Sequence, residues 1–461
     1  MAKALELEMI NTKYDLVSGT WFEYTESLGQ WRRLTDFEID QKIFKLLMKR
    51  EDVNNLLTSD YRNRVKLALE MINGVNFNNF RSRNQNLQLI PFKNGVLDLT
   101  KNELLPLNAE YYFTHSLNIN YDPLAKLSLE MIKFLTSISN NQLINLKVLR
   151  SFIKCVLLLD NQYQVALYLY GPGGTGKSTF EKLLISLVGN NNSTTLDLND
   201  LNKQFSISKV VDKSLVLFSD VQAYTGDPSK LRLLISGDIM NAERKYKNSF
   251  DLQPVALVVL SSNVLWNPKD SSTGLQRRII YIPVTTVPTV KDKNLFHYNL
   301  TNNVSSGTLA DSLSGLVNWA LANPESNLNL LTEATSTNDL INPDVLNKTN
   351  PLVDWVKSYL TFEPGSSIRV GSKSLSPELF LYPNYLLFCK EYGYKSLAFN
   401  NFSDQLLQQL NTLISPLIEK RKTKLGMTFF QVKLNKEPVS SLPSSESDSQ
   451  DSSSEFKDFT E

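Results

Sequence analysis

Residues 164–188 read QVALYLYGPGGTGKSTFEKLLISLV, and the glycine-rich centre of this stretch decides the fold class of the chain. An apolar, β-prone run at 165–170 precedes the centre, and an amphipathic helical pattern at 179–188 follows it. The centre fits G-x-x-x-x-G-K-[ST], a phosphate loop that needs a strand before it and a helix after it. A glycine-rich turn with a chance lysine is the alternative, and the flanking elements disfavour it. The pattern therefore predicts a binding site for a nucleoside triphosphate.

The residue types of this loop suit separate tasks. Glycines let successive backbone N–H groups turn inward around a polyphosphate, and the following helix adds its N-terminal dipole. We expect Lys177 to reach the β- and γ-phosphates of ATP and the hydroxyl of Ser178 to ligate Mg²⁺. The predicted nucleotide-binding residues are Gly171, Pro172, Gly173, Gly174, Thr175, Gly176, Lys177, Ser178 and Thr179.

Three later runs would complete such a site. SLVLFSD ends in Asp220, which would be the acid linked to Mg²⁺, although any buried strand can end in an aspartate. PVALVVLSSN ends in Asn263, which would sense the γ-phosphate or position water; a plain turn asparagine is the alternative. Arg277 and Arg278 open a third β-run, either as a solvated edge or as guanidinium groups offered to a γ-phosphate across a subunit boundary.

Composition bounds the remaining possibilities. A chain of 461 residues with 42% hydrophobic content has room for roughly two to four domains. Cys155 and Cys389 have no metal-ligand spacing, which fits a reducing compartment and disfavours a structural zinc. No apolar run approaches the length of a membrane span, and the N-terminus resembles neither a signal peptide nor a transit peptide. We therefore expect no membrane partner.

Periodicity and composition divide the chain into four segments. The first combines a β-rich opening around Trp21 and Trp31, helical patterning at 36–71 and a strand-turn-strand at 87–105. The second is helical at 126–160, and from 164 to about 285 its apolar β-runs alternate with helices, which indicates a sheet with helices on its faces. A small domain of helices with a terminal β-hairpin follows, and then an acidic, Ser-rich tail that should be disordered. The predicted bounds are 1–125, 126–345, 346–436 and 437–461.

The order of these motifs resembles a known family. The succession GPGGTGKST, LVLFSD, ERKYKNSF, VVLSSN and GLQRRIIYIPV is similar to that of the superfamily 3 helicases of small viruses, phages and plasmids. It looks closest to the phage/plasmid and poxvirus-type primase-helicases. IPFKNGVLDL at 90–99 with YYFTH at 111–115 resembles the domain before their ATPase, and LYPNYLLFCKEYG at 381–393 with Phe402 resembles their C-terminal module.

This resemblance implies a fold and an assembly. The fold class would be α/β: an AAA+-like P-loop ATPase core, a mostly helical N-terminal domain and a small winged-helix-like C-terminal domain. The core would assemble as a ring, usually a hexamer, with Arg277 or Arg278 acting in the neighbour's site. Lys245 and Lys247 would lie on a hairpin facing the channel and bind nucleic acid, although a solvated charged hairpin is the alternative.

The function that the resemblance implies is an ATP-dependent replicative DNA helicase, translocating 3′ to 5′ on single-stranded or forked DNA. The first 85 residues are too short for a polymerase-like primase domain, so we expect a helicase without its own primase, for which a separate primase would be a partner. The Asn/Lys/Leu bias suits a plasmid, virus or organelle genome, and hence the cytoplasm or an organelle stroma or matrix. Residues 401–410 would form a recognition helix in the C-terminal domain, although packing within that domain is at least as good an explanation for this helix.

One departure from the family pattern leaves two alternative functions open. The family usually has paired acids at the second motif, whereas Ser219 precedes Asp220 here, which leaves the water-activating base unassigned. Gln222 would orient water without accepting its proton. A nucleotide-gated DNA-binding or replication-initiation factor with little hydrolysis is therefore the main alternative. An RNA-directed ring ATPase is a third reading, which the flanking segments disfavour.

Overall fold

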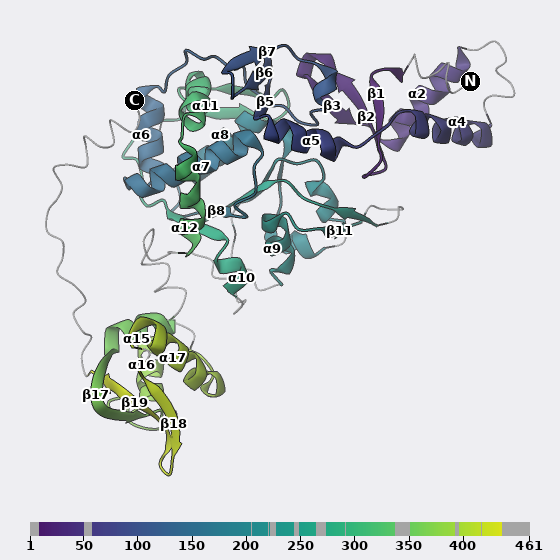
Figure 1. Cartoon of the computed structure of the whole chain (residues 1–461). Helices are drawn as coiled ribbons and strands as arrows, with labels where there is room; N and C mark the ends of the chain where they lie inside the picture. Colours follow the sequence, from purple (N-terminus) through teal and green to yellow (C-terminus); the bar gives the residue numbers. More distant parts are fainter. Residues whose placement is uncertain are drawn as a thin grey trace. The chain divides into compact units, whose positions relative to one another are not determined.

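The computed structural model describes residues 9–49, 58–203, 205–219, 221, 227–243, 249–263, 273–290, 292–336, 351–391, 396–415 and 417–435. They belong to two compact units that divide between residues 336 and 337, and each unit is described by itself (Figure 1). Residues 337–350 of the expected connection and the predicted acidic tail at 437–461 lie outside the described residues. The predicted four-segment boundaries stay a prediction.

The first unit opens with a four-stranded sheet in the order β3-β2-β1-β4. Its strands are β1 (Thr12–Asp15), β2 (Thr20–Thr25), β3 (Gln30–Arg33) and β4 (Gly74–Val75). β1 pairs antiparallel with β2 and parallel with β4, which follows it by about 60 residues. The helices α2 (Asp36–Met48) and α4 (Ser59–Ile72) bury apolar side chains in one core with Trp21.

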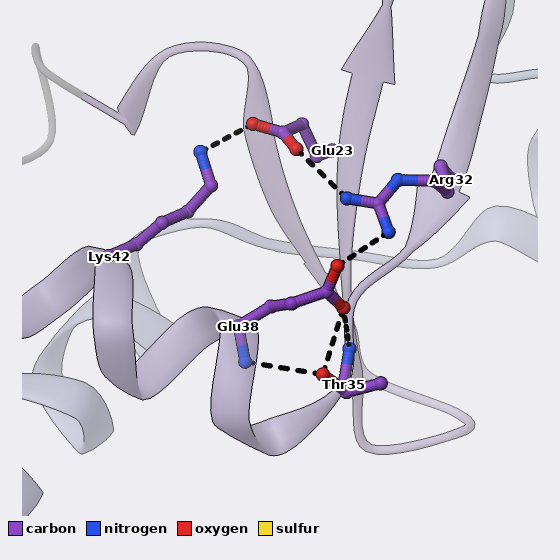
Figure 2. Close-up of polar contacts among 5 residues, drawn as sticks. All are labelled: Glu23, Arg32, Thr35, Glu38 and Lys42. Carbon is purple, nitrogen blue, oxygen red and sulfur yellow. Dashed lines mark hydrogen bonds and ion pairs between the residues drawn. The ribbon is translucent and has the colours of Figure 1, made fainter.

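A polar network fixes the start of α2 beside this sheet, as Figure 2 shows. Thr35 caps the helix: its hydroxyl accepts from the amide of Glu38 at 3.2 Å, and the Glu38 carboxylate accepts from the Thr35 amide at 2.7 Å. Arg32 on β3 donates to Glu38 at 2.8 Å, and Glu23 on β2 pairs with both Arg32 and Lys42. The Thr35 backbone bond, followed by the Arg32 bond, lowers the pKa of Glu38 to about 2. This capping box satisfies two backbone donors at the start of α2.

A second, three-stranded sheet follows α5 (Phe77–Asn86). β5 (Leu89–Phe92) and β6 (Gly95–Asp98) form a hairpin with a two-residue turn, which confirms the predicted strand-turn-strand, and β7 (Glu103–Leu105) pairs with β6. The described part of the N-terminal region thus holds seven strands beside three helices. The expectation of a mostly helical N-terminal domain is corrected to a mixed one, because short strands leave little periodic signal and depend on distant partners.

Helices then lead into the central sheet. They are α6 (Leu129–Ile138) and α7 (Leu143–Leu158), as the sequence predicts for 126–160. α7 packs against α8 (Lys177–Val188), α11 (Leu313–Leu321) and α12 (Leu330–Ser336), and is buried along most of its length. Lys154 is the charged residue on its buried part, and its ammonium donates to the carbonyl of Asn323 at 2.6 Å. α7 is therefore a core element of the first unit.

The central sheet has five strands, all parallel, in the order β14-β8-β13-β10-β9. The strands are β8 (Ala166–Tyr170), β9 (Ser193–Thr195), β10 (Leu215–Phe218), β13 (Leu257–Ser262) and β14 (Ile279–Pro283). Helix α8 (Lys177–Val188) packs on β10 and β13, α9 (Ser229–Ser236) on β13, and α12 on β14. The three middle strands are buried almost throughout, as parallel strands covered by helices are. The predicted α/β sheet is confirmed.

Smaller elements complete the first unit. β11 (Met240–Ala242) pairs antiparallel with β12 (Phe250–Leu252), and β15 (His297–Asn299) with β16 (Val304–Ser306); α10 (Thr273–Gln276) precedes β14. The short 3-10 helices are Glu26–Leu28, Ala109–Tyr111, Asn190–Asn192, Leu198–Asn202, Ile207–Val210, Ala310–Ser312 and Glu325–Asn329.

The second unit is a small α/β domain, as predicted for a helical domain with a terminal hairpin. Its elements are α15 (Pro351–Tyr359), β17 (Leu360–Arg369), α16 (Leu381–Glu391), α17 (Phe399–Leu413), β18 (Glu419–Thr423) and β19 (Gly426–Leu434). The sheet is antiparallel in the order β17-β19-β18. Trp355 lies in its core, and the indole N–H donates to Asn384 at 2.7 Å. α17 contains the predicted recognition segment and turns Phe402, Leu406 and Leu410 into that core, which supports a packing use for that face.

Candidate nucleotide-binding site

The predicted phosphate loop lies at the carboxyl end of β8 and runs into the first turn of α8. Gly171, Gly174 and Gly176 have φ angles of +144°, +84° and +99°, which side-chain-bearing residues rarely adopt. A Cβ on Gly171 would lie 2.2 Å from the carbonyl oxygen of Val284, just after β14. The loop therefore needs glycine at this position to pass beside the neighbouring strand.

Three amide groups of the loop are available to an anion. Those of Gly173, Gly174 and Gly176 donate no hydrogen bond within the described residues, and nothing lies within 4 Å of a Cβ built on Gly173. Gly176 is the N-cap of α8, so the positive end of a twelve-residue helix faces the same loop. Unpaired amides next to a helix N-terminus form a concave anion site, and the residues present fit a polyphosphate.

Lys177 holds its charge inside the loop. Its ammonium donates to the carbonyl oxygens of Gly171 at 2.6 Å and Pro172 at 2.8 Å, and the side chain is 7% exposed. The hydroxyl of Thr175 donates to Pro172 at 3.1 Å and tightens the same turn. Ser178 is exposed in the first helical turn, next to Lys177, and Thr179 is half-buried. Since Mg²⁺ on a nucleotide needs only one or two protein ligands, the Ser178 hydroxyl fits that task.

The ends of three neighbouring strands meet beside the loop. The amide of Gly171 donates to the carbonyl of Ser262 at 3.2 Å, which ties the loop to the end of β13. Asn263 comes next, is exposed, and is thus brought beside the loop as expected from sequence. The amide of Val221 donates to the carbonyl of Ser261 at 2.8 Å, so the chain after β10 follows the same edge. Asp220, the predicted Mg²⁺-linked acid, lies outside the described residues.

Arg277 and Arg278 lie at the amino ends of the parallel strands, whereas the phosphate loop lies at the carboxyl ends. They precede β14, which runs parallel to β8 with Ile279 opposite Ala166, so a strand about 15 Å long separates them from the loop. Arg278 is held there: its guanidinium donates to Gly274 at 2.7 Å and to Gln164 at 3.5 Å, and burial lowers its pKa. Arg277 is exposed. Neither arginine serves the phosphate loop of its own chain.

The predicted nucleic-acid hairpin is described only at its base. β11 and β12 pair with Ala242 opposite Phe250, on either side of the segment in question. Lys245 and Lys247 lie outside the described residues, so their role stays a prediction.

Sequence reasoning missed one charged group at this site. Glu181, on α8, is 5% exposed, and its carboxylate accepts from the hydroxyl of Ser219 at 3.0 Å, at the end of β10. Burial raises its pKa, while Ser261, Ser219 and the charge of Lys177 act in the opposite direction. A helical pattern would have revealed it, since Lys177, Glu181 and Leu184 share one buried face of α8.

None of the helices in the described part of the chain has both the length and the apolar character that crossing a bilayer requires. Within the same residues, no group of three or more His, Cys, Asp or Glu side chains is placed to hold a metal ion.

Comparison with known proteins gives the following matches. The chain resembles the NrS-1 C-terminal region in two apo structures, with 12% and 11% identity, TM-scores of 0.47 and 0.45, and coverage of 94% and 92% of this chain and 98% and 96% of that one. A mitochondrial protein of Marchantia polymorpha described as uncharacterized, ymf20, is 27% identical over 112 residues, which make up 24% of this chain and 65% of that relative. The match thus spans less than two thirds of the relative's length.

Family models match three separate segments. Residues 169–278, which hold the phosphate loop and the strand ends, match a family of unknown function, DUF5906. Residues 10–140 match "D5 N terminal like", and residues 347–441 match "Poxvirus D5 protein-like". Both regions that flank the central sheet are therefore similar to D5-type proteins, as the resemblance to poxvirus-type primase-helicases predicts.

Proposed function

We propose that this chain is an ATP-dependent DNA helicase of superfamily 3, acting in the replication of a plasmid, virus or organelle element. The observation that carries the proposal is the phosphate loop at the end of β8. The Lys177 ammonium is held inside this loop, 2.6 Å from the carbonyl oxygen of Gly171, and the ends of β10 and β13 lie beside it. Similarity to D5-type proteins on both sides supports a replication function. The relative named as mitochondrial favours the organelle alternative over a cytoplasmic location.

The residues divide the work on ATP between them. Lys177 and the loop amides would hold the β- and γ-phosphates, and Ser178 with Asp220 would hold Mg²⁺. Bound Mg²⁺ supplies charge neutralisation on the transferred phosphoryl group. Asn263, exposed at the end of β13, would orient the attacking water. The protein's part is to position the reactants and exclude bulk water from them.

The arginines favour a site shared between subunits. Arg277 lies at the amino ends of the strands, and its own phosphate loop lies at their carboxyl ends. It would therefore reach a nucleotide only in a neighbouring chain. An AAA+-type ring, usually a hexamer, provides that neighbour. Such a ring would enclose one DNA strand at a fork, with Lys245 and Lys247 lining the channel and a separate primase as a possible partner.

A second candidate function has one observation in its favour. Ser219 stands at the end of β10, where the family pattern has the first of two acids, and it uses its hydroxyl to bond Glu181. A nucleotide-gated DNA-binding or initiation factor, which assembles on DNA without rapid hydrolysis, would tolerate that change.

Steady-state phosphate release by the wild-type chain separates the two functions. A helicase is expected to hydrolyse ATP faster by several-fold when single-stranded DNA is added, since translocation couples turnover to the strand. Competition between DNA and RNA homopolymers decides the nucleic acid. ATP binding with no DNA-stimulated release would favour the initiation factor and contradict the helicase.

A mixing experiment tests the shared site. We expect Arg277→Ala to lower ATP turnover by at least about tenfold, because the guanidinium that would stabilise charge on the neighbour's γ-phosphate is lost. Mixing this variant with Lys177→Ala should restore part of the turnover, since some interfaces then join an intact loop to an intact arginine. If the ATP turnover of the mixture is only the average of the turnovers of the two variants, Arg277 does not act between subunits.

A further inference from the structure

Helix α8 carries a carboxylate on its buried side. Glu181 is 5% exposed and lies one turn after Lys177, on the face that packs against β10 and β13. Glutamates are almost never buried this deeply unless they are paired, because an ionised carboxylate loses much hydration free energy inside a protein. A leucine or glutamine would fill the position at lower cost, so the carboxylate calls for a functional explanation.

The contacts of this carboxylate leave part of it unsatisfied. Oε2 accepts a hydrogen bond from the hydroxyl of Ser219 at 3.0 Å. Oε1 is buried and accepts no hydrogen bond of regular geometry within the described residues, although the Ser261 side chain is near enough to lower the pKa of the carboxyl. A buried polar atom of this kind in a native fold points to a group that joins it, such as an ordered water or an ion. The neighbouring charge of Lys177 favours the ionised form of the carboxyl, against the burial that raises its pKa.

The position of Ser219 explains why a carboxylate is useful there. Ser219 is the first residue after β10, and the chain continues through Val221 along the end of β13, whose Ser262 carbonyl bonds the phosphate loop. An acid at this strand end would face the Mg²⁺ that accompanies the phosphates. Ser219 itself has no charge. The carboxylate of Glu181, on α8, accepts a hydrogen bond from the Ser219 hydroxyl and so supplies a negative charge next to this strand end.

We propose that Glu181 is the missing second acid of the nucleotide site, a positioning residue that acts on Mg²⁺ through the hydroxyl of Ser219. This inference rests on the proposed function, because it presupposes a Mg²⁺-nucleotide in the loop. Glu181 holds negative charge beside the metal site and orients the Ser219 oxygen toward it. Groups that orient metal ligands from the outer shell tune metal affinity strongly.

The test measures how Mg²⁺ changes nucleotide binding, independently of turnover. A fluorescent ATP analogue is titrated into the full chain with EDTA and then with increasing free Mg²⁺. We expect Glu181→Gln to bind the analogue in EDTA at least as tightly as the wild type, and to need about tenfold more Mg²⁺ for the same gain in affinity. Ser219→Ala, at an exposed position, should shift the Mg²⁺ requirement in the same direction by a smaller factor.

A rescue variant distinguishes a metal role from a packing role. Adding Ser219→Asp to Glu181→Gln restores an acid at the strand end, so we expect the Mg²⁺ requirement to return toward the wild-type value. An unchanged Mg²⁺ requirement in both Glu181→Gln and Ser219→Ala would overturn the inference, and so would failure of the rescue in a folded double variant. If Glu181→Gln does not fold, Ser219→Ala alone decides. A wild-type chain that binds no nucleotide in EDTA or in Mg²⁺ would instead refute the proposed function.

Discussion

Replacing Lys177 by alanine is expected to lower ATP turnover by between about 10²- and 10³-fold, the usual effect of removing one preorganised charge from a phosphoryl-transfer site. The ammonium lies 2.6 and 2.8 Å from the carbonyls of Gly171 and Pro172, so its position in the loop is fixed before nucleotide arrives. Phosphate release with single-stranded DNA present is the measurement.

The matched control is Lys182→Ala. Lys182 lies on the same helix, is exposed, and follows the buried Glu181, so the change removes an equal charge without touching the loop. Its turnover should stay near the wild-type value. Because Lys177 also bonds loop carbonyls, the thermal unfolding of Lys177→Ala must be compared with that of the wild type. A folded Lys177→Ala with unchanged turnover would contradict ATP hydrolysis at this loop.

The elements around the phosphate loop could be predicted because their signals are local. Strands β8 and β10 are uninterrupted apolar runs, and β13 is apolar up to its two final serines; such runs are the pattern of buried parallel strands. The loop and the start of α8 follow from one motif, and Asn263 follows from the rule that parallel strands end at one edge of a sheet. The hairpin of β5 and β6 follows from the turn residues Lys93 and Asn94.

The remaining features depend on contacts between distant residues. The bond from Ser219 to Glu181 joins residues 38 positions apart, and of the two only Ser219 belongs to a motif, LVLFSD. The pairing of β4 with β1 brings Gly74 beside Tyr14, and a two-residue strand has no periodicity to detect. The sequence shows that Arg277 precedes a β-run. Only the parallel pairing of β14 with β8 shows that Arg277 is far from the phosphate loop of its own chain. Each of these features needed the three-dimensional arrangement.

Replacing Gly171 by alanine is expected to destabilise the first unit by about 3 kcal/mol, from backbone strain and overpacking together. Gly171 has a φ of +144°, and the new Cβ would lie 2.2 Å from the Val284 carbonyl oxygen and 2.9 Å from its carbon. Relief by movement is costly because the amide of Val284 donates to the carbonyl of Tyr170 at 2.7 Å, just before the loop. Thermal unfolding, with and without nucleotide, measures the effect.

Gly173→Ala provides the comparison within the same loop. Nothing lies within 4 Å of a Cβ built there, and its backbone is outside the left-handed region, so stability should change by no more than about 0.5 kcal/mol. Nucleotide should raise the melting temperature of Gly171→Ala much less than it raises that of the wild type. Equal melting of the two variants would mean that the loop does not pass against Val284. Val284 directly follows β14, and Arg278 directly precedes it. The clash at Val284 would therefore also displace β14, the strand that runs from the two arginines to the phosphate loop.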